Sequence, residues 1–252
     1  MIYGLWQSAA GLQAQEYRQA IIANNLANAE TPGFKADRVA FQERLNTAVT
    51  GGDARVSHPV LDTMTGGLYE TPVFTDFAQG SLISSNNDLD VALDGEGFLV
   101  VQTPDGARYT RDGRMMMSAG GMLVHAVSGA AMLDGEGQPI FLDASVKDRI
   151  NIDESGRISQ GRIPAGRLGI VDFPDTRKLE KVGQDLFTAE GIRPVEARPA
   201  VKQNAYEASG VEPITALVEM IAAGRAYESN ARMISLQDES LGRMVSELGR
   251  IG

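Results

Sequence analysis

The sequence predicts an α+β protein in which long helices at the two ends of the chain pair as a coiled-coil-like module around an inserted antiparallel β domain. Amphipathic patterns over residues 213–248 and 2–28 indicate the helices. Between them, short apolar runs alternate with Asp-Gly and Gly-Gly turn signals, as in antiparallel strands joined by hairpins. We expect a discontinuous helical module (1–30 and 211–252), a linker or extended arm (31–87), an antiparallel β domain (88–195) and a return linker (196–210).

The segment from Pro213 to Leu248 carries the longest unbroken amphipathic pattern. Apolar or small residues recur there in steps of three and four, which predicts a helix facing a partner helix. Two consecutive steps of three between Ile221 and Tyr227 indicate a stammer, a local overwinding of the coiled coil. The predicted line is Ile214, Leu217, Ile221, Gly224, Tyr227, Ala231, Ile234, Leu241, Val245 and Leu248.

A second apolar stripe on the same helix is formed by Met233, Leu236 and Met244. At the rise of an α-helix the segment is roughly 54 Å long, more than is needed to cover its own domain. We therefore expect other protein chains to bury part of it.

A second helix is predicted from Ile2 to Asn28, with apolar heptad positions at Ile2, Leu5, Ala9, Leu12, Ala23 and Leu26. The complementary patterns at the two termini suggest that the helices pair with each other. The alternative is two surface helices of one globular domain.

The first helix is expected to end before Pro32, which disfavours a helical conformation at Thr31. Pro32 and Gly33 suit the centre of a type II turn. Three asparagines with poor helix propensity precede this turn. Either they bond to nearby backbone or their amides bond to a neighbouring helix, and both interpretations stay open. The three are Asn24, Asn25 and Asn28.

The stretch from Lys35 to Ser85 has no firm assignment. Val39, Phe41 and Leu45 are compatible with a short helix, whereas the aromatic and polar residues between Tyr69 and Phe77 suggest a strand or extended arm.

Composition limits the partners. The 252 residues include 33 acidic and 23 basic side chains, a formal charge of -10, which repels phosphate backbones and argues against nucleic acid. No apolar run reaches 18 residues, so no membrane span is expected. The first thirty residues lack the pattern of a cleavable signal peptide.

Motifs for catalysis, cofactors or metals are not found. Asp-Gly-Glu-Gly occurs at 94–97 and 134–137, where tight turns are the favoured interpretation over a calcium loop. His58 and His125 lie far apart and are expected at the surface or half-buried. The sequence therefore predicts a non-enzyme without cofactor or metal. The alternative of another class is a secreted β-domain hydrolase acting on cell-wall glycan through Asp90, Asp94 or Glu96.

Four ordered motifs resemble those of the bacterial flagellar rod and hook proteins. They are Ala23-Asn24-Asn25-Leu26-Ala27-Asn28-Ala29-Glu30-Thr31-Pro32-Gly33-Phe34-Lys35, residues 87–98 (Asn-Asp-Leu-Asp-Val-Ala-Leu-Asp-Gly-Glu-Gly-Phe), Tyr109-Thr110-Arg111-Asp112-Gly113 and Arg225-Ala226-Tyr227-Glu228-Ser229-Asn230. The resemblance extends over nearly the whole chain. Residues 135–140, 179–187 and 210–213 are more similar to proximal-rod than to distal-rod or hook-type members.

The resemblance implies a structural subunit of the basal-body rod in the periplasm, with terminal helices in the inner tube and a β domain outside. It also implies other rod subunits as partners, both homotypic and heterotypic, and passage through the flagellar type III export apparatus. The expected assembly residues are Leu5, Ala9, Leu12, Asn24, Asn25, Leu26, Asn28, Leu217, Ile221, Gly224, Tyr227, Asn230, Ala231, Ile234, Leu241 and Val245, with the motif turn Thr31, Pro32, Gly33 and Phe34.

Overall fold

The computed structural model describes residues 2–43, 68–70, 73–143, 149–183 and 185–248. The described chain divides into two compact units. The helical unit comprises described residues within 1–27, 37–74 and 212–252, and the β unit comprises those within 28–36 and 75–211. The α+β class and the paired terminal helices with an antiparallel β domain between them in sequence are confirmed.

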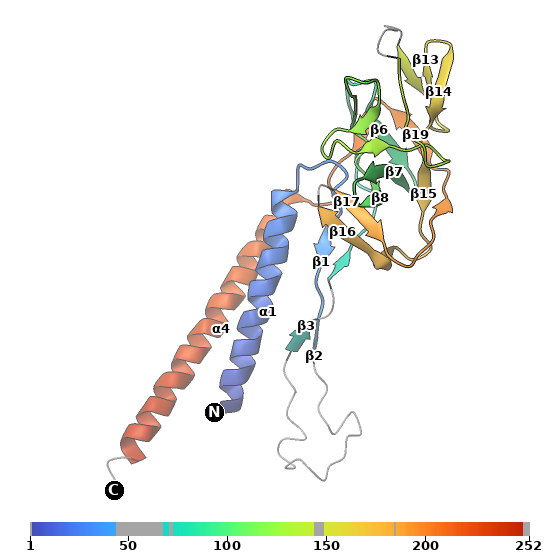
Figure 1. The fold of residues 1–252 in the computed structure, drawn as a ribbon. Coiled ribbons are helices and arrows are strands. Elements are labelled where there is room, and N and C mark those ends of the chain that lie inside the picture. The colour runs from blue at the N-terminus through green and yellow to red at the C-terminus, as the bar shows by residue number, and fades with distance from the viewer. Residues whose placement is uncertain (1, 44–67, 71–72, 144–148, 184, 249–252) are drawn as a thin grey trace. The chain divides into compact units, whose positions relative to one another are not determined.

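Two long antiparallel helices, α1 (Ile2–Ala27) and α4 (Pro213–Leu248), form most of the helical unit (Figure 1). The bounds of α4 are those predicted, since Pro213 suits a first helical position. The helices meet where glycines on α1 face amides on α4. A methyl group on Gly4 would lie 2.9 Å from Gln237 Nε2, and one on Gly11 would lie 3.1 Å from Asn230 Nδ2.

The side of α4 that packs against α1 follows an unbroken heptad of alternating four- and three-residue steps. Ala223 and Ala216 are its most buried members, at 1% and 6% exposure. The full line, which we call the inner seam, is Ala216, Met220, Ala223, Tyr227, Asn230, Ile234, Gln237 and Leu241.

As the face that packs against α1, the predicted line is therefore wrong for the first half of α4. Leu217 and Ile221 are 48% and 57% exposed, and the line meets the inner seam only at Tyr227, Ile234 and Leu241. The inner seam contains no stammer, because alanines and amide side chains, and not large apolar residues, occupy several of its heptad positions. Gly224 faces the Gln19 side chain: a methyl group on Gly224 would lie 3.4 Å from Gln19 Nε2.

Short strands accompany the helices. β1 (Asp37–Arg38) pairs with β4 (Phe74–Thr75), and β2 (Phe41–Glu43) pairs with β3 (Leu68–Glu70). The option of a short helix over Val39 and Phe41 is wrong, since β2 lies there, and Leu45 lies outside the described residues. Phe41 is paired with Glu70 in the ladder, so the arm is an antiparallel ribbon at this point.

A nine-stranded antiparallel sheet is the main layer of the β unit. Its order is β16-β17-β8-β7-β11-β10-β9, with β15 on β7 and β18 on β15. The strands are β7 (Phe98–Thr103), β8 (Gly106–Thr110), β9 (Met115–Met117), β10 (Leu123–His125), β11 (Ala131–Met132), β15 (Ile170–Asp172), β16 (Leu179–Gly183), β17 (Leu186–Ala189) and β18 (Val195–Glu196). A 3-10 turn, η1 (Thr176–Lys178), precedes β16.

Smaller antiparallel sheets complete the β unit. One contains β12 (Ile150–Ile152), β13 (Arg157–Gln160) and β14 (Ile163–Arg167). β19 (Ala200–Gln203) pairs with β6 (Val91–Asp94), and β20 (Ala205–Glu207) pairs with β5 (Leu82–Ser84). The expectation of a return linker over 196–210 is therefore wrong, because β18, β19 and β20 each bond to a strand of the β unit. Residues 75–87, assigned to the arm, also belong to the β unit.

Two apolar clusters form the core of the β unit. The larger includes Val91, Leu99, Val101, Leu123 and Met132, none of them measurably exposed. The second is aromatic and contains Phe98, Phe173 and Phe187 with Leu179. These clusters hold the strands and turns that carry the sequence motifs.

Candidate functional site: the junction of the sequence motifs

A buried carboxylate, Glu207 on β20, lies at the centre of a charged cluster in the β unit. Its Oε1 accepts from Lys35 Nζ at 2.5 Å and from Gly80 N at 2.7 Å. Its Oε2 accepts from Arg111 Nη1 at 3.4 Å. Glu207, Lys35 and Arg111 are 0%, 1% and 4% exposed. We call these three residues the clasp.

Burial is the main influence on the charges of the clasp. It lowers the pKa of Lys35 and of Arg111, because removal from water disfavours the cationic forms, while Glu207 opposes the shift in both. Arg111 Nε is buried without a hydrogen-bond partner in the described structure. Glu207 is the carboxylate that contributes most to compensating these two buried cations, so its loss removes the largest favourable interaction of both.

The clasp joins the segments by which the chain enters and leaves the β unit. Gly33 N donates to Glu207 O at 2.8 Å, and Gly210 N donates to Phe34 O at 2.8 Å. Lys181 Nζ donates to Lys35 O at 2.5 Å and lies 4.1 Å from the centre of the Phe34 ring. Residues 33–35 and 207–210 are thus held together although they are distant in sequence.

The predicted turn at Pro32-Gly33 is present. Phe34 N donates to Thr31 O at 3.3 Å, and Gly33 has a φ of 71°, as the third position of a type II turn requires. A methyl group on Gly33 would lie 2.4 Å from Asp112 N. The turn therefore contacts the Tyr109–Gly113 motif through a position that only glycine fits.

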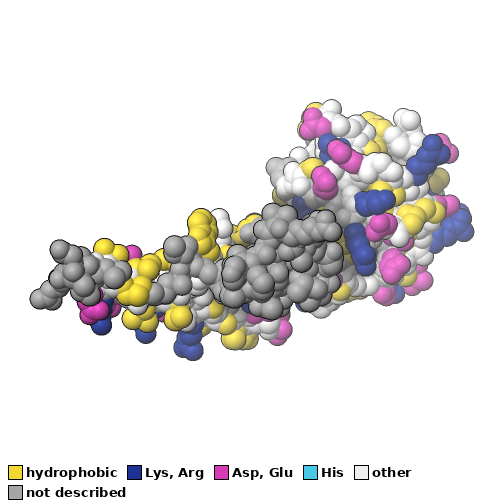
Figure 2. Space-filling model, turned by 90° about the horizontal axis from the view of Figure 1, so that it is seen from below, with side chains coloured by type: hydrophobic (Ala, Val, Ile, Leu, Met, Phe, Trp, Pro, Cys, Tyr) yellow, Lys and Arg dark blue, Asp and Glu magenta, His cyan; other side chains and the backbone are white. Residues whose placement is uncertain are grey.

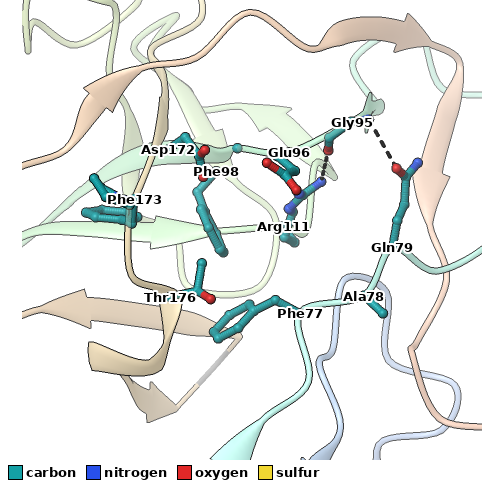
Figure 3. A pocket seen from close by; sticks show the side chains of 12 residues that line it. Phe77, Ala78, Gln79, Gly95, Glu96, Phe98, Arg111, Asp172, Phe173 and Thr176 are labelled. Atoms are coloured by element: carbon teal, nitrogen blue, oxygen red, sulfur yellow. Dashed lines mark hydrogen bonds between the residues drawn. The ribbon is translucent and has the colours of Figure 1, made fainter.

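The motif of residues 87–98 reaches the same place. Val91 N donates to Gly113 O at 3.0 Å, and a methyl group on Gly113 would lie 1.8 Å from Val91 O. Gly95 O accepts from Arg111 Nη1 at 2.8 Å, and the Arg111 guanidinium lies 5.3 Å from the centre of the Phe98 ring (Figure 3). Three of the four motifs thus meet at what we call the motif junction.

Two asparagines at the end of the first helix, Asn25 within it and Asn28 just after it, make hydrogen bonds of different kinds. Asn25 Nδ2 donates to Asp37 O at 2.7 Å and its Oδ1 accepts from Asp37 N at 2.9 Å. Asn28 O accepts from Thr31 N at 3.1 Å, and Asn28 Oδ1 accepts from Thr31 Oγ1 at 3.3 Å, so these two residues form a local turn. The Asn25 amide thus bonds to the backbone of β1, and the Asn28 amide bonds to a side chain of the turn.

His125 is fully buried, so its predicted surface or half-buried position is wrong. Its Nε2 lies 3.3 Å from Asp112 Oδ2, and its Nδ1 lies 2.8 Å from Ser128 Oγ. Burial alone would raise the pKa of Asp112, but hydrogen bonds from His125 and Arg114 hold it below its ordinary value. Strand pairing brings these residues together, and the sequence spacing offers no signal for it.

The Asp112, His125 and Ser128 group resembles a catalytic relay only in its residue types. Ser128 N donates to His125 Nδ1 and Ala130 N donates to Ser128 Oγ, both at 3.3 Å. Since a backbone N–H donates to Nδ1, that nitrogen is the acceptor of the ring, and Nε2 faces Asp112. These bonds organise the turn between β10 and β11.

The other carboxylates considered for chemistry are in turns. Asp134 Oδ1 accepts from the backbone of Glu136 and Gln138, which supports the interpretation of Asp-Gly-Glu-Gly as a turn. Asp90 is buried and accepts from Ser85 and Asn87, whereas Asp94 and Glu96 are exposed. In the described part of the chain, no group of three His, Asp or Glu side chains is placed to hold a metal ion. His58 lies outside the described residues.

The expected assembly residues fall into three classes. Leu217, Ile221, Val245 and Asn24 are exposed. Pro32, Gly33 and Phe34 are buried in the β unit, where they form part of the motif junction. The remaining residues are half-buried: Leu5, Ala9, Leu12, Asn25, Leu26, Asn28, Thr31, Gly224, Tyr227, Asn230, Ala231, Ile234 and Leu241.

Within the described ranges, no helix is both long enough and apolar enough to cross a membrane.

Three protein-family models match the chain. Residues 8–35 match "Flagella basal body rod protein", residues 92–160 match "Flagellar hook protein FlgE/F/G D1 domain", and residues 202–247 match "Flagellar basal body rod FlgEFG protein C-terminal". The matched ranges contain most of α1, most of the motif junction and most of α4.

Similar proteins match over nearly their whole length. The chain is 36% identical to the flagellar basal-body rod protein FlgF of Caulobacter vibrioides, over 92% of this chain and 91% of that protein. It is 34% identical to FlgG of Buchnera aphidicola, over 97% and 99% of the two chains. The flagellar hook-basal body complex protein FlhO of Bacillus subtilis is 29% identical over the full length of both.

Proposed function

The chain belongs to the family of flagellar basal-body rod proteins and is a structural subunit of the rod, and from this premise we propose that its terminal helices drive polymerisation into the axial shaft. Its location is the basal body, and its partners are other rod subunits. The proposal concerns which surfaces make the contacts.

The observation that carries this proposal is an apolar surface on α4 that α1 does not cover. Ile214, Leu217, Val218 and Ile221 are 74%, 48%, 62% and 57% exposed, and their spacing places them on one face of the helix. Hydrophobic side chains gather on the surface of the helical unit (Figure 2). We call these four residues the outer patch.

Further along α4, Met233, Leu236 and Met244 are 48%, 54% and 38% exposed and form the second apolar stripe. Fully burying one Val, Leu or Ile side chain contributes about 1.5 to 3 kcal/mol. Contiguous exposed apolar residues of this kind mark an interaction surface. Packing against other rod subunits supplies the burial that a single chain lacks.

The substitution Ile221→Asp tests the outer patch. A charge placed in a helix interface without a partner costs roughly 3 to 5 kcal/mol, so rods are not expected to form. The free chain is expected to keep its helix content, because Ile221 is already exposed in it. Basal-body yield and swimming, with circular dichroism of the purified chain, are the measurements.

The matched control for this substitution is Ser235→Asp, which adds the same charge at an exposed position of α4 beyond the outer patch. Surface changes of this kind are usually within about 0.5 kcal/mol, so this variant is expected to assemble. Normal swimming by Ile221→Asp, or equal failure of both variants, would contradict the proposal. Ile234 is unsuitable for the test because it is half-buried on the inner seam.

We further propose a position in the proximal rod, passage through the flagellar type III export apparatus, and a periplasmic location of the assembled subunit. The support for the first is the similarity of residues 135–140, 179–187 and 210–213 to proximal-rod members. An uncleaved N-terminus is supported by α1, whose packing against α4 would be lost with it. Mass spectrometry of purified basal bodies is expected to find a subunit with α1 intact; a chain shortened by some twenty residues would overturn this.

The subunit is also proposed to be non-enzymatic and not to bind nucleic acid. The support for the first is that Asp90 and Asp112 are occupied by structural hydrogen bonds, and for the second a formal charge of -10. A muramidase assay and a gel-shift assay on the purified chain are the corresponding measurements, and activity or binding would refute the respective statement.

A further inference from the structure

A cavity of about 520 Å³ opens beside the motif junction, wholly within the β unit. Its walls come from the segment before β5, from the turn between β6 and β7, and from the segment after β15 (Figure 3). The lining residues that matter here are Phe77, Phe98, Phe173, Glu96, Asp172 and Arg111. We call it the phenylalanine–carboxylate cavity. A volume of this size is typical of binding sites.

Three phenylalanine rings form the apolar part of the wall. The Phe77 and Phe98 ring centres are 5.5 Å apart at 80°, and those of Phe98 and Phe173 are 5.8 Å apart at 60°. Phe98 and Phe173 are buried in the aromatic cluster, so their positions are fixed before any ligand arrives. Phe77 is half-buried, so its ring is the one that a ligand can contact. The face of such a ring attracts cations, and a planar guanidinium can also stack on it.

Two carboxylates complete the wall. Glu96 is exposed and Asp172 is half-buried; neither forms a salt bridge in the described part of the chain, but both interact electrostatically with Arg111. Among the lining residues, these two carboxylates face one cation, Arg111, whose guanidinium already donates to Gly95 O and Glu207 Oε2. The cavity therefore has an excess negative charge at its solvent side.

The sign of the charge decides between two classes of ligand. An anion would meet the carboxylates of Glu96 and Asp172 and would compete with Glu207 for Arg111. A cation would meet two carboxylates that face only one cation of the lining, Arg111, together with the half-buried Phe77 ring. An arginine side chain suits both the carboxylates and the ring, because its planar guanidinium can stack on a ring while two of its N–H groups donate to a carboxylate.

We propose that the phenylalanine–carboxylate cavity binds an arginine side chain presented by a neighbouring rod subunit. This inference rests on the proposed function, since it assigns a second subunit contact to the β unit in addition to the outer patch of α4. The arginine stacks against the Phe77 ring and pairs with Glu96 and Asp172.

The test is a titration of the isotope-labelled full chain, followed by the amide resonances of Gly97 and Phe98. The probes are acetyl-Ala-Arg-Ala-amide, the same peptide with citrulline in place of arginine, and acetyl-Ala-Asp-Ala-amide. Citrulline keeps the shape of arginine without its charge. The arginine peptide is expected to bind at least tenfold more tightly than the other two. Equal binding of the citrulline peptide, or tighter binding of the aspartate peptide, overturns the proposal.

The double variant Glu96→Gln, Asp172→Asn is expected to weaken binding of the arginine peptide about tenfold, because it removes two partly exposed charge pairs. Its control is Glu136→Gln, Glu190→Gln, which changes the charge equally at exposed positions that do not line the cavity. The control is expected to bind as the wild type does. Unchanged binding by the cavity variant overturns the proposal.

Basal bodies separate this inference from the proposed function. The cavity variant is expected to yield fewer complete rods than its control; equal yield overturns the assignment of the arginine to a neighbouring subunit. If Ile221→Asp blocks assembly but the arginine peptide does not bind, the cavity proposal alone fails. If the peptide binds and Ile221→Asp assembles normally, polymerisation through the outer patch fails and the cavity stands as a binding site.

Discussion

Replacing Glu207 by glutamine is expected to lower the free energy of unfolding of the β unit by roughly 3 to 5 kcal/mol. The amide keeps the shape of the side chain but leaves Lys35 and Arg111 buried without their carboxylate. Urea unfolding of the full chain, followed by far-ultraviolet circular dichroism, measures the change. Tryptophan fluorescence does not report on it, because the single tryptophan, Trp6, is in α1.

Two further variants show whether the effect comes from the buried charges. Glu190→Gln, at an exposed position, is expected to change stability by no more than about 0.5 kcal/mol. Combining Glu207→Gln with Lys35→Met removes one of the uncompensated cations, so the combined loss is expected to be smaller than the sum of the single losses. Strictly additive losses, or a loss below about 1 kcal/mol for Glu207→Gln, would show that the clasp does not stabilise the fold.

The substitution Gly113→Ala is expected to destabilise the β unit by on the order of 4 kcal/mol or more. Its methyl group would lie 1.8 Å from Val91 O, and a backbone carbonyl cannot turn aside as a flexible side chain can. Val91 is fully buried, and β6 is held by β19, so the strand has no free space to enter. Thermal unfolding of the full chain measures the effect.

Gly135→Ala is the control for this steric argument. A methyl group there meets no atom within 4 Å, and Gly135 is not among the glycines with positive φ. Its stability is expected to stay the same or to rise by up to about 1 kcal/mol, because alanine restricts the unfolded chain. Similar melting temperatures for the two variants would mean that β6 can move away from Gly113.

The two helices illustrate how far periodicity predicts the structure. Pro213 and the long amphipathic pattern give the bounds of α4 correctly, since both are local properties. In the first half of α4 the large apolar residues lie on a different face from the one that contacts α1, so their periodicity does not predict the contact face. The inner seam instead uses Ala216, Ala223, Asn230 and Gln237, whose small or amide side chains fit against α1 and its glycines.

The motif junction was predictable only in part. The turn at Pro32-Gly33 follows from local rules, and the structure has it. The clasp does not, because Lys35 and Glu207 are 172 residues apart in the chain and no periodicity relates them. The same holds for His125, which reaches Asp112 through the pairing of β9 with β10. The one signal for the clasp in the sequence was that Lys35 and Arg111 belong to motifs that contain no catalytic pattern.

The clasp has a mechanical consequence for a rod subunit. A force carried along the chain from α1 enters the β unit at residues 33–35, and a force from α4 enters at residues 207–210. These segments are bonded to each other through Gly33, Phe34, Glu207 and Gly210. Tension between the two chain ends therefore passes directly across these hydrogen bonds, and the strands from β6 to β19 are not stretched by it.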